Sequence, residues 1–441
     1  MPTKTTLVFL LSGGPLAPPL RGIGVSEDQP RSTLGKWKVM STPEHLSHVD
    51  PDLWPALATV PTGGLFGRTR VRKAEAHFAD ICREAGISLG TGADITVSSD
   101  ALFYRLAESG WLGIGESYMA GEWTAGDLPT VLRRLMSVAY VPKKKARVVP
   151  SNEEAMGIPT DLRRLASGSL VSLQPGIFNA GIPTVTTPNP ALTTRTYSAP
   201  GRVLPRDLDE AQQRALAVLC ADVDIRSGDF VSELGYNGAA LSAVASSMGA
   251  RAEYLSADPL NVEKVRAARI PGVSVGRIPF PVPTERTRPR RFTVVTTGDY
   301  ANVLSESAFS AFVRWGSENL SPVGSVAVSA LVRTGDHAII DHVLQVTRRY
   351  LAPTFRLPDA AKMSRIVSRA SGLPKLSTTV FDTHVAPSFG IFFTNFDNAE
   401  SEAAALGFDS CYRNLFRFTL ASVEALGESG MIGARHIIAS H

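Results

Sequence analysis

Short apolar runs alternate with amphipathic stretches along the C-terminal half of the chain. The amphipathic stretches repeat apolar residues at helical spacing, which predicts helices at residues 208–220, 239–248, 261–268 and 306–319. The apolar runs predict strands at residues 230–234, 252–256, 292–296 and 325–330. Strands separated by helices of about 10 to 15 residues are typical of a parallel sheet with helices on both faces. The pattern therefore predicts one doubly wound (Rossmann-like) α/β domain over residues 208–441.

A second, smaller pattern occupies residues 50–138. It predicts a strand at residues 95–97, a helix at residues 101–108 and a Gly-rich aromatic turn at residues 113–123. Asp127 is placed to cap a further helix, whose apolar residues recur on one face. These elements predict a small α+β domain ahead of the larger one.

The segments outside the two domains are predicted to be irregular. Residues 1–49 are interpreted as a disordered leader, because their apolar run at residues 7–11 is shorter than the ~7–15 residues of a signal-peptide core. Met40 is an alternative start of the protein. Residues 139–207 combine a basic linker with a Pro- and Thr-rich stretch. The prolines of residues 174–205 disfavour both helix and central strand, so an extended loop is expected there.

Composition excludes several classes of protein. The 441 residues are 44% hydrophobic and 20% charged, which excludes wholesale disorder. No uninterrupted apolar run reaches the roughly 18 residues that span a bilayer. A net charge of +4 is too small to indicate nucleic-acid binding. The three cysteines lie far apart and the histidines are isolated, so neither disulfides nor a metal site are indicated, and a reducing, cytoplasmic location is expected.

The strongest chemical signal is a Gly-bearing turn after the strand at residues 230–234. Glu233 ends that strand, and Gly235 and Gly238 lie in the turn that opens the next helix. A carboxylate and glycines in this place are typical of S-adenosylmethionine (SAM) binding, since glycines let the backbone approach the ligand. Asp258 ends the second strand, where it could accept hydrogen bonds from a ribose. The alternative is that these glycines only let the helix pack closely against the strand. Asn237 occupies a position at which a SAM-binding turn is expected to have glycine.

The chain resembles the cyclopropane-fatty-acyl-phospholipid synthase family of SAM-dependent methyltransferases. The most specific element is the segment Gly-Glu-Ser-Tyr-Met-Ala-Gly-Glu-Trp at residues 115–123, which is similar to a motif of the family's N-terminal, lipid-facing domain. Tyr197 with its neighbours and residues 406–409 add to the resemblance. The resemblance implies a class I methyltransferase domain, SAM as the cofactor with Tyr197 among its contacts, and a fatty-acyl phospholipid as the partner molecule.

Several positions depart from the family pattern. The family's His-Tyr-Asp-Leu segment falls on residues 179–182, and prolines replace the helix that would follow it. Its Glu-Met-Ile-Glu segment falls on residues 298–301, where Asp299 and Tyr300 lie one position away from the glutamates. A His-Tyr pair becomes His384-Val385. Since these positions serve proton removal and cation stabilisation in the family, the departures favour weak or lost SAM binding and a catalytically impaired pseudoenzyme.

Three hypotheses follow from the sequence. The first is an accessory or regulatory subunit of an active fatty-acyl methyltransferase, such as a paralogue. The second is an active SAM-dependent methyltransferase acting on unsaturated phospholipid acyl chains. The third is a lipid-binding module, in which aromatic residues at 389–396 line an acyl channel rather than an ordinary core or a dimer face. Short basic runs allow a peripheral position at an anionic membrane surface.

Overall fold

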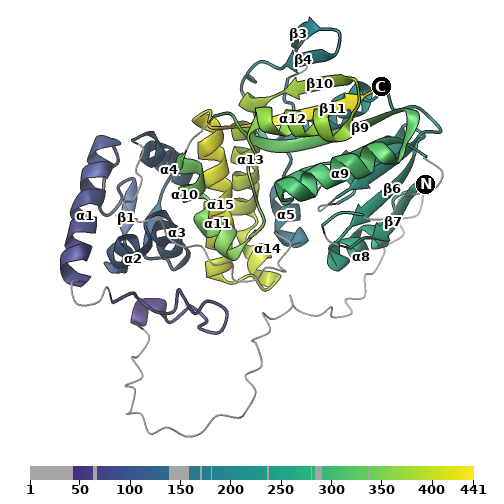
Figure 1. Cartoon of the computed structure of the whole chain (residues 1–441). Coiled ribbons are helices and arrows are strands. Elements are labelled where there is room, and N and C mark those ends of the chain that lie inside the picture. The colour runs from purple at the N-terminus through teal and green to yellow at the C-terminus, as the bar shows by residue number, and fades with distance from the viewer. Residues whose placement is uncertain are drawn as a thin grey trace, which may run out of the picture.

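The computed structural model describes residues 43–62, 67–138, 158–168, 171–179, 181–235, 238–279, 281–283, 291–335 and 338–441 (Figure 1). Most of the leader expected at residues 1–49 and the first part of the segment expected to be irregular at residues 139–207, residues 139–157, lie outside this range, as do Tyr236 and Asn237. Residues 43–49, counted with the leader in the sequence analysis, contribute the buried side chains of Leu46 and Val49 to the core.

A nine-stranded mixed sheet forms the centre of the C-terminal domain. The strand order is β3-β4-β10-β11-β9-β8-β5-β6-β7. Its strands are β3 (Thr184–Asn189), β4 (Leu192–Thr196), β5 (Phe230–Leu234), β6 (Arg251–Ser256), β7 (Val273–Arg277), β8 (Phe292–Thr297), β9 (Leu320–Arg333), β10 (Lys375–Val380) and β11 (Ile432–Ser440). Strand β11 runs antiparallel to β9 and β10, so the sheet is mixed rather than purely parallel.

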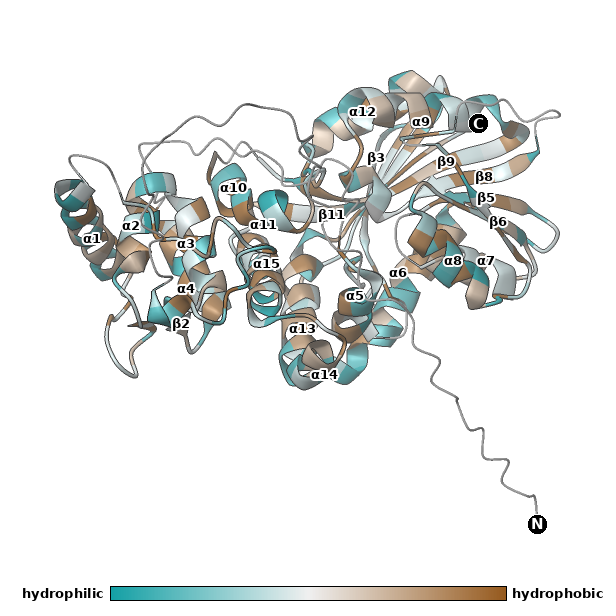
Figure 2. Ribbon diagram, turned by 90° about the horizontal axis from the view of Figure 1, so that it is seen from below, coloured by the Kyte–Doolittle hydropathy of each residue, from teal (hydrophilic) through white to brown (hydrophobic). Residues whose placement is uncertain are grey.

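Helices cover both faces of this sheet, as Figure 2 shows. One face carries α9 (Glu306–Glu318) and α12 (Ala360–Ser371), whose apolar residues share a core with β8 and β9. The other face carries α6 (Leu208–Asp222) and α7 (Ala240–Ser247), which share a core with β5 and β6. Helix α8 (Pro259–Ala267) connects β6 to β7. The predicted doubly wound α/β fold is confirmed.

The Pro- and Thr-rich stretch is only in part the extended loop that the sequence predicts, because residues 184–196 form a hairpin. Strands β3 and β4 form an antiparallel hairpin, and β4 pairs in parallel with β10 at the end of the sheet. Strand β3 is the first in the strand order and therefore an edge strand, and all of its residues are exposed. Pro188 is tolerated in β3 because an edge strand needs no donor on its outer side.

The N-terminal region packs a small hairpin among helices. The hairpin consists of β1 (Ile95–Val97) and β2 (Trp123–Ala125), and the helices are α1 (Gly67–Glu84), α2 (Ala101–Ser109), α3 (Trp111–Met119) and α4 (Leu128–Ser137). The prediction of an aromatic turn at residues 113–123 is wrong, because most of these residues belong to helix α3. Asp127 caps α4 as predicted, since its side chain accepts a hydrogen bond from the Thr130 amide at 3.1 Å.

A layer of helices joins the N-terminal region to the sheet (Figure 1). It contains α5 (Thr160–Ser167), α10 (Ala338–Val343), α11 (Gln345–Tyr350), α13 (Val385–Asn398), α14 (Glu400–Ala405) and α15 (Ser410–Glu428). Helix α15 contacts both α3 and α4 of the N-terminal region and packs along α13. Among the described residues, none of the helices has the length and apolar character needed to cross a bilayer.

Candidate functional site

A small cavity lies at the carboxyl ends of β5 and β8, the place where doubly wound sheets bind ligands. Glu233, Gly235 and Gly238 line it, together with Gly298 after β8 and Gln212 of α6. The structure therefore brings three of the five sequence-predicted cofactor residues together. The volume of the cavity is about 50 Å³.

The Glu233 carboxylate is held by the first turn of α7. One of its oxygens accepts hydrogen bonds from the backbone amide and the hydroxyl of Ser242, at 2.8 and 2.6 Å. A carboxylate at a helix N-terminus is favoured because it satisfies free amides and faces the positive end of the helix dipole. Glu233 is 7% exposed, so this side chain is a buried anchor of α7.

Gly235 is required by the packing of an aromatic ring. A Cβ atom at this position would lie 2.1 Å from Cε2 of Tyr254, which is fully buried on β6. The Tyr254 hydroxyl accepts a hydrogen bond from Asn261 Nδ2 at 2.6 Å, which holds the ring in place. Close packing of the turn on β6 is thus a sufficient reason for glycine at position 235.

The other two predicted cofactor residues do not line this cavity. Asp258 is the N-cap of α8, and its Oδ1 atom accepts a hydrogen bond from the Leu260 amide at 2.9 Å. Tyr197 follows β4, and its amide donates to the Val380 carbonyl at 2.9 Å. The pKa of Tyr197 is raised by burial, which keeps its hydroxyl protonated.

His384 holds the Tyr197 segment, a role that the sequence did not reveal. Its Nδ1 atom accepts a hydrogen bond from the Phe178 amide at 3.1 Å, so Nε2 carries the proton and donates to the Ser198 carbonyl at 2.9 Å. Burial lowers the pKa of His384, which keeps the ring neutral. The imidazole therefore ties the segments on both sides of the β3–β4 hairpin to the start of α13.

Three buried polar atoms at the cavity have no hydrogen-bond partner among the described residues. They are Oε1 of Gln212, Oγ1 of Thr296 and Nδ1 of His436. Burial lowers the pKa of His436 to about 3, so this ring is neutral. A polar cavity of about 50 Å³ holds one or two waters, which could satisfy these atoms. No sequence signal marked His436, a single histidine in an apolar strand.

The cavity bounded by the described residues is smaller than a typical site for a ligand of the size of SAM. Sites for small organic ligands are typically about 300–1000 Å³, several times the roughly 50 Å³ found here. The Glu233 carboxylate, which the sequence analysis aims at the cationic end of the cofactor, is engaged by Ser242. The Tyr254 ring packs directly against the turn at Gly235. The described residues therefore bound a small cavity, and one oxygen of the carboxylate that lines it is already engaged by the protein.

The positions at which the sequence departs from the family also lack polar groups at the cavity. Gly298 lines the cavity without a side chain, and Ala301 and Val385 are buried apolar residues. Tyr300, considered above as a replacement, donates its hydroxyl to the Pro281 carbonyl at 2.7 Å. The side chain of Asp299 lies outside the described residues. Across the described part of the chain, no cluster of three or more His, Cys, Asp or Glu side chains could hold a metal.

The segment at residues 115–123 has a structural role. Glu122 forms a fully buried ion pair with Arg105, whose Nε lies 3.0 Å from both carboxylate oxygens. The same guanidinium donates to the carbonyls of Ala56 and Leu57, at 3.0 and 2.8 Å. These contacts fix the chain before α1 onto α2 and β2.

A second set of contacts joins this segment to the C-terminal domain. Glu116 accepts a hydrogen bond from the Tyr350 hydroxyl at 2.7 Å, and burial raises the pKa of its carboxyl. Gly115 lets α3 approach α11, because a Cβ atom there would lie 2.8 Å from Val346. Asp409, in the C-terminal part of the resemblance, caps α15 and accepts from Trp54 Nε1 at 2.6 Å. Both segments therefore hold the N-terminal region against the C-terminal helices.

The aromatic residues of α13 form a packed core. The rings of Phe389 and Phe392 lie 5.1 Å apart, and Phe396 packs edge-on against Phe416 of α15 at 4.7 Å. All four side chains are buried. This packing favours the ordinary-core alternative over an acyl channel.

Comparison with known proteins finds a methyltransferase that is similar to most of the chain. The chain is 24% identical over 407 residues to tuberculostearic acid methyltransferase UfaA1 of Mycobacterium tuberculosis, a match that covers 87% of this chain and 94% of that protein. No protein-family model matches the chain.

Solved structures share the fold. The cyclopropane synthase MmaA2 of Mycobacterium tuberculosis matches with a TM-score of 0.51 at 12% identity, covering 64% of this chain and 94% of that one. Coclaurine N-methyltransferase, solved with N-methylheliamine and S-adenosylhomocysteine, matches with a TM-score of 0.51 at 14% identity, covering 75% and 98%. The C-terminal domain thus has the class I SAM-methyltransferase fold.

Proposed function

We propose that this chain, which belongs with the cyclopropane-fatty-acyl-phospholipid synthase family by its sequence relationship and fold, is a catalytically impaired member of that family. In this proposal it acts as an accessory or regulatory subunit of an active fatty-acyl methyltransferase. The observation that carries the proposal is the cavity of about 50 Å³ where the family's cofactor is expected. Because SAM is the methyl donor, a chain without room for it cannot transfer a methyl group.

The chemistry of the family makes the altered positions important. Methyl transfer to an alkene leaves a carbocation, which needs nearby polar groups and, for a cyclopropane product, a base. The corresponding positions carry Gly298, Ala301 and Val385, none of which has a polar side chain. At the cavity, the unbonded basic atom among the described residues is Nδ1 of His436, and burial lowers the pKa of this ring to about 3, which makes it a weak base.

The accessory role is supported by what the chain retains. Glu116 and Asp409 make polar contacts that join the N-terminal region to the C-terminal helices, and Glu122 makes a buried ion pair within the N-terminal region. The parts that resemble the family most closely therefore maintain the shape of the molecule, while the reaction positions have lost their chemistry. A preserved shape without a reaction centre suits binding to an active methyltransferase.

A methyl-transfer assay tests both parts of the proposal. Purified chain is incubated with methyl-labelled SAM and oleoyl phospholipid vesicles, first alone and then with an active family member from the same cell. No labelled lipid is expected from the chain alone, and a changed rate is expected when it is added to the active enzyme. An equal mass of albumin controls for non-specific effects. Labelled lipid from the chain alone would contradict the loss of catalysis, and an unchanged rate would contradict the accessory role.

A further inference from the structure

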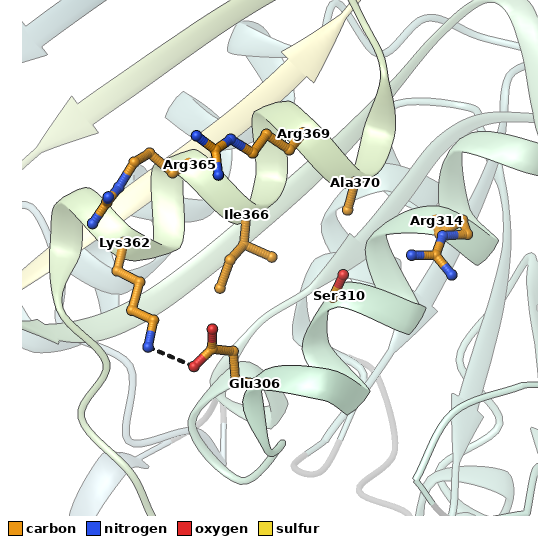
Figure 3. Close-up of a pocket in the computed structure, with 8 residues that line it drawn as sticks. All are labelled: Glu306, Ser310, Arg314, Lys362, Arg365, Ile366, Arg369 and Ala370. Atoms are coloured by element: carbon orange, nitrogen blue, oxygen red, sulfur yellow. Dashed lines mark ion pairs between the residues drawn. The ribbon is translucent and has the colours of Figure 1, made fainter.

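A basic groove lies between α9 and α12, on the outer side of the layer that covers β8 and β9 (Figure 3). Its volume is about 320 Å³. Two rows of side chains, each spaced by one helical turn, form its walls: Glu306, Ser310 and Arg314 from α9, and Lys362, Ile366 and Ala370 from α12. Arg365 and Arg369 add a second row from α12 at the rim.

Most of the positive charge in this groove is not neutralised. Lys362 forms an ion pair with Glu306 at 2.6 Å, which closes one end. Arg314, Arg365 and Arg369 form no ion pair with any described carboxylate, and Arg365 donates only to the Ala361 carbonyl at 3.4 Å. Arg314 on α9 and Arg365 and Arg369 along the outer side of α12 are therefore exposed cations beside a groove whose single acidic residue is already paired (Figure 3).

The stability of α12 does not explain this arrangement. Arg365 and Arg369 are four residues apart on one helix, a spacing at which like charges repel. The helix dipole favours Arg369, which lies in the last turn, but not Arg365 in the middle of the helix. Repelling cations beside a groove are stabilised when an anion binds between them.

We propose that this groove binds the phosphate of an anionic phospholipid headgroup at a membrane surface. A guanidinium group can donate two parallel hydrogen bonds to a phosphate, which a lysine cannot do. Ile366 and Ala370 provide apolar surface for the glycerol part of the headgroup. The groove has room for a headgroup but not for a whole lipid, so the acyl chains stay in the bilayer. The choice of a lipid over a soluble phosphate rests on the proposed function in fatty-acyl modification.

Vesicle sedimentation without SAM tests the groove independently of catalysis. The full chain is mixed with phosphatidylcholine vesicles that contain or lack phosphatidylglycerol. A basic residue near an anionic surface strengthens binding by up to about fivefold, so Arg314→Gln/Arg365→Gln/Arg369→Gln is expected to weaken it by on the order of 100-fold at low salt. The matched control is Arg68→Gln/Arg72→Gln/Lys73→Gln, which removes the same charge from the exposed face of α1 and is expected to bind within severalfold of the wild type.

Each outcome decides the proposal. Binding that needs phosphatidylglycerol and is lost only in the groove variant supports it. Equal losses of vesicle binding in the two variants would show that binding depends on overall charge and would overturn the proposal. Absence of vesicle binding would also overturn it, as would Arg-dependent binding of glycerol phosphate alone, measured by calorimetry. Thermal unfolding of each variant confirms that it is folded. Methyl transfer by the chain would contradict the proposed function and leave these binding results unaffected.

Discussion

Glu122→Gln tests whether the segment at residues 115–123 maintains the structure. The substitution removes the charge of a carboxylate that is 0% exposed and leaves Arg105, which is 1% exposed, without its counter-ion. Two of the guanidinium hydrogen bonds, to the carbonyls of Ala56 and Leu57, remain. The glutamine oxygen can still accept from Nε. The main loss is therefore the compensation of a buried positive charge.

Breaking a buried ion pair by removing one partner costs about 3–5 kcal/mol. Because glutamine keeps one acceptor, we expect the lower end, about 3 kcal/mol of unfolding free energy. Urea unfolding at neutral pH, followed by circular dichroism, measures this loss. Hydrogen exchange should rise at residues 54–58, which Arg105 anchors.

The double variant Arg105→Met/Glu122→Leu separates the cost of an unpaired charge from the value of the pair. Replacing both partners with apolar residues of similar size removes the uncompensated charge. The double variant should therefore recover roughly 2 kcal/mol or more relative to Glu122→Gln. A Glu122→Gln protein within about 0.5 kcal/mol of the wild type would refute the structural role.

Three further predictions concern other buried polar groups. Burial, and to a smaller extent two neighbouring carboxylates, raise the pKa of Glu424 to about 8. The folded state therefore favours the protonated carboxyl. The resulting stabilisation is complete below the unfolded pKa near 4.5 and is lost as the pH rises through about 8. Glu424→Gln should therefore be more stable than the wild type above this pH, by on the order of 2 kcal/mol in urea unfolding, and equal stabilities at pH 9 would count against the assignment. His384→Ala removes the partners of the Phe178 amide and the Ser198 carbonyl, so the local opening free energy should fall by about 2 kcal/mol, seen as faster hydrogen exchange at Phe178. Asp409→Ala should lose about 2 kcal/mol through the α15 cap and the Trp54 contact, whereas Asp409→Asn, which keeps an acceptor, should lose less than half as much in thermal unfolding.

The sequence predicted the elements whose signals are local. The alternation of apolar and amphipathic stretches over residues 208–330 predicted four helices and four strands at nearly their final positions. The prediction for residues 113–123 failed because Gly113 and Gly115 were interpreted as turn residues. Gly113 is instead a contact residue, since a Cβ atom there would lie 2.2 Å from the Arg105 carbonyl oxygen. Such a close approach between two helices is invisible in a single sequence.

The candidate site was predictable only in part. Glu233, Gly235 and Gly238 follow one strand, so their common location could be predicted from chain order. His384 contacts Phe178 across 206 positions of the sequence, and nothing local indicates this pairing. The Ser242 contact that engages Glu233 was also missed, because a serine in the first turn of a helix is an ordinary feature.

Calorimetric titration of the purified chain with SAM tests the central claim most directly. The small volume of the cavity and the engagement of Glu233 by α7 predict no saturable binding in the micromolar range. Saturable binding with a low-micromolar Kd, weakened by Asp258→Ala, would contradict the account and restore the interpretation of this chain as a SAM-dependent methyltransferase.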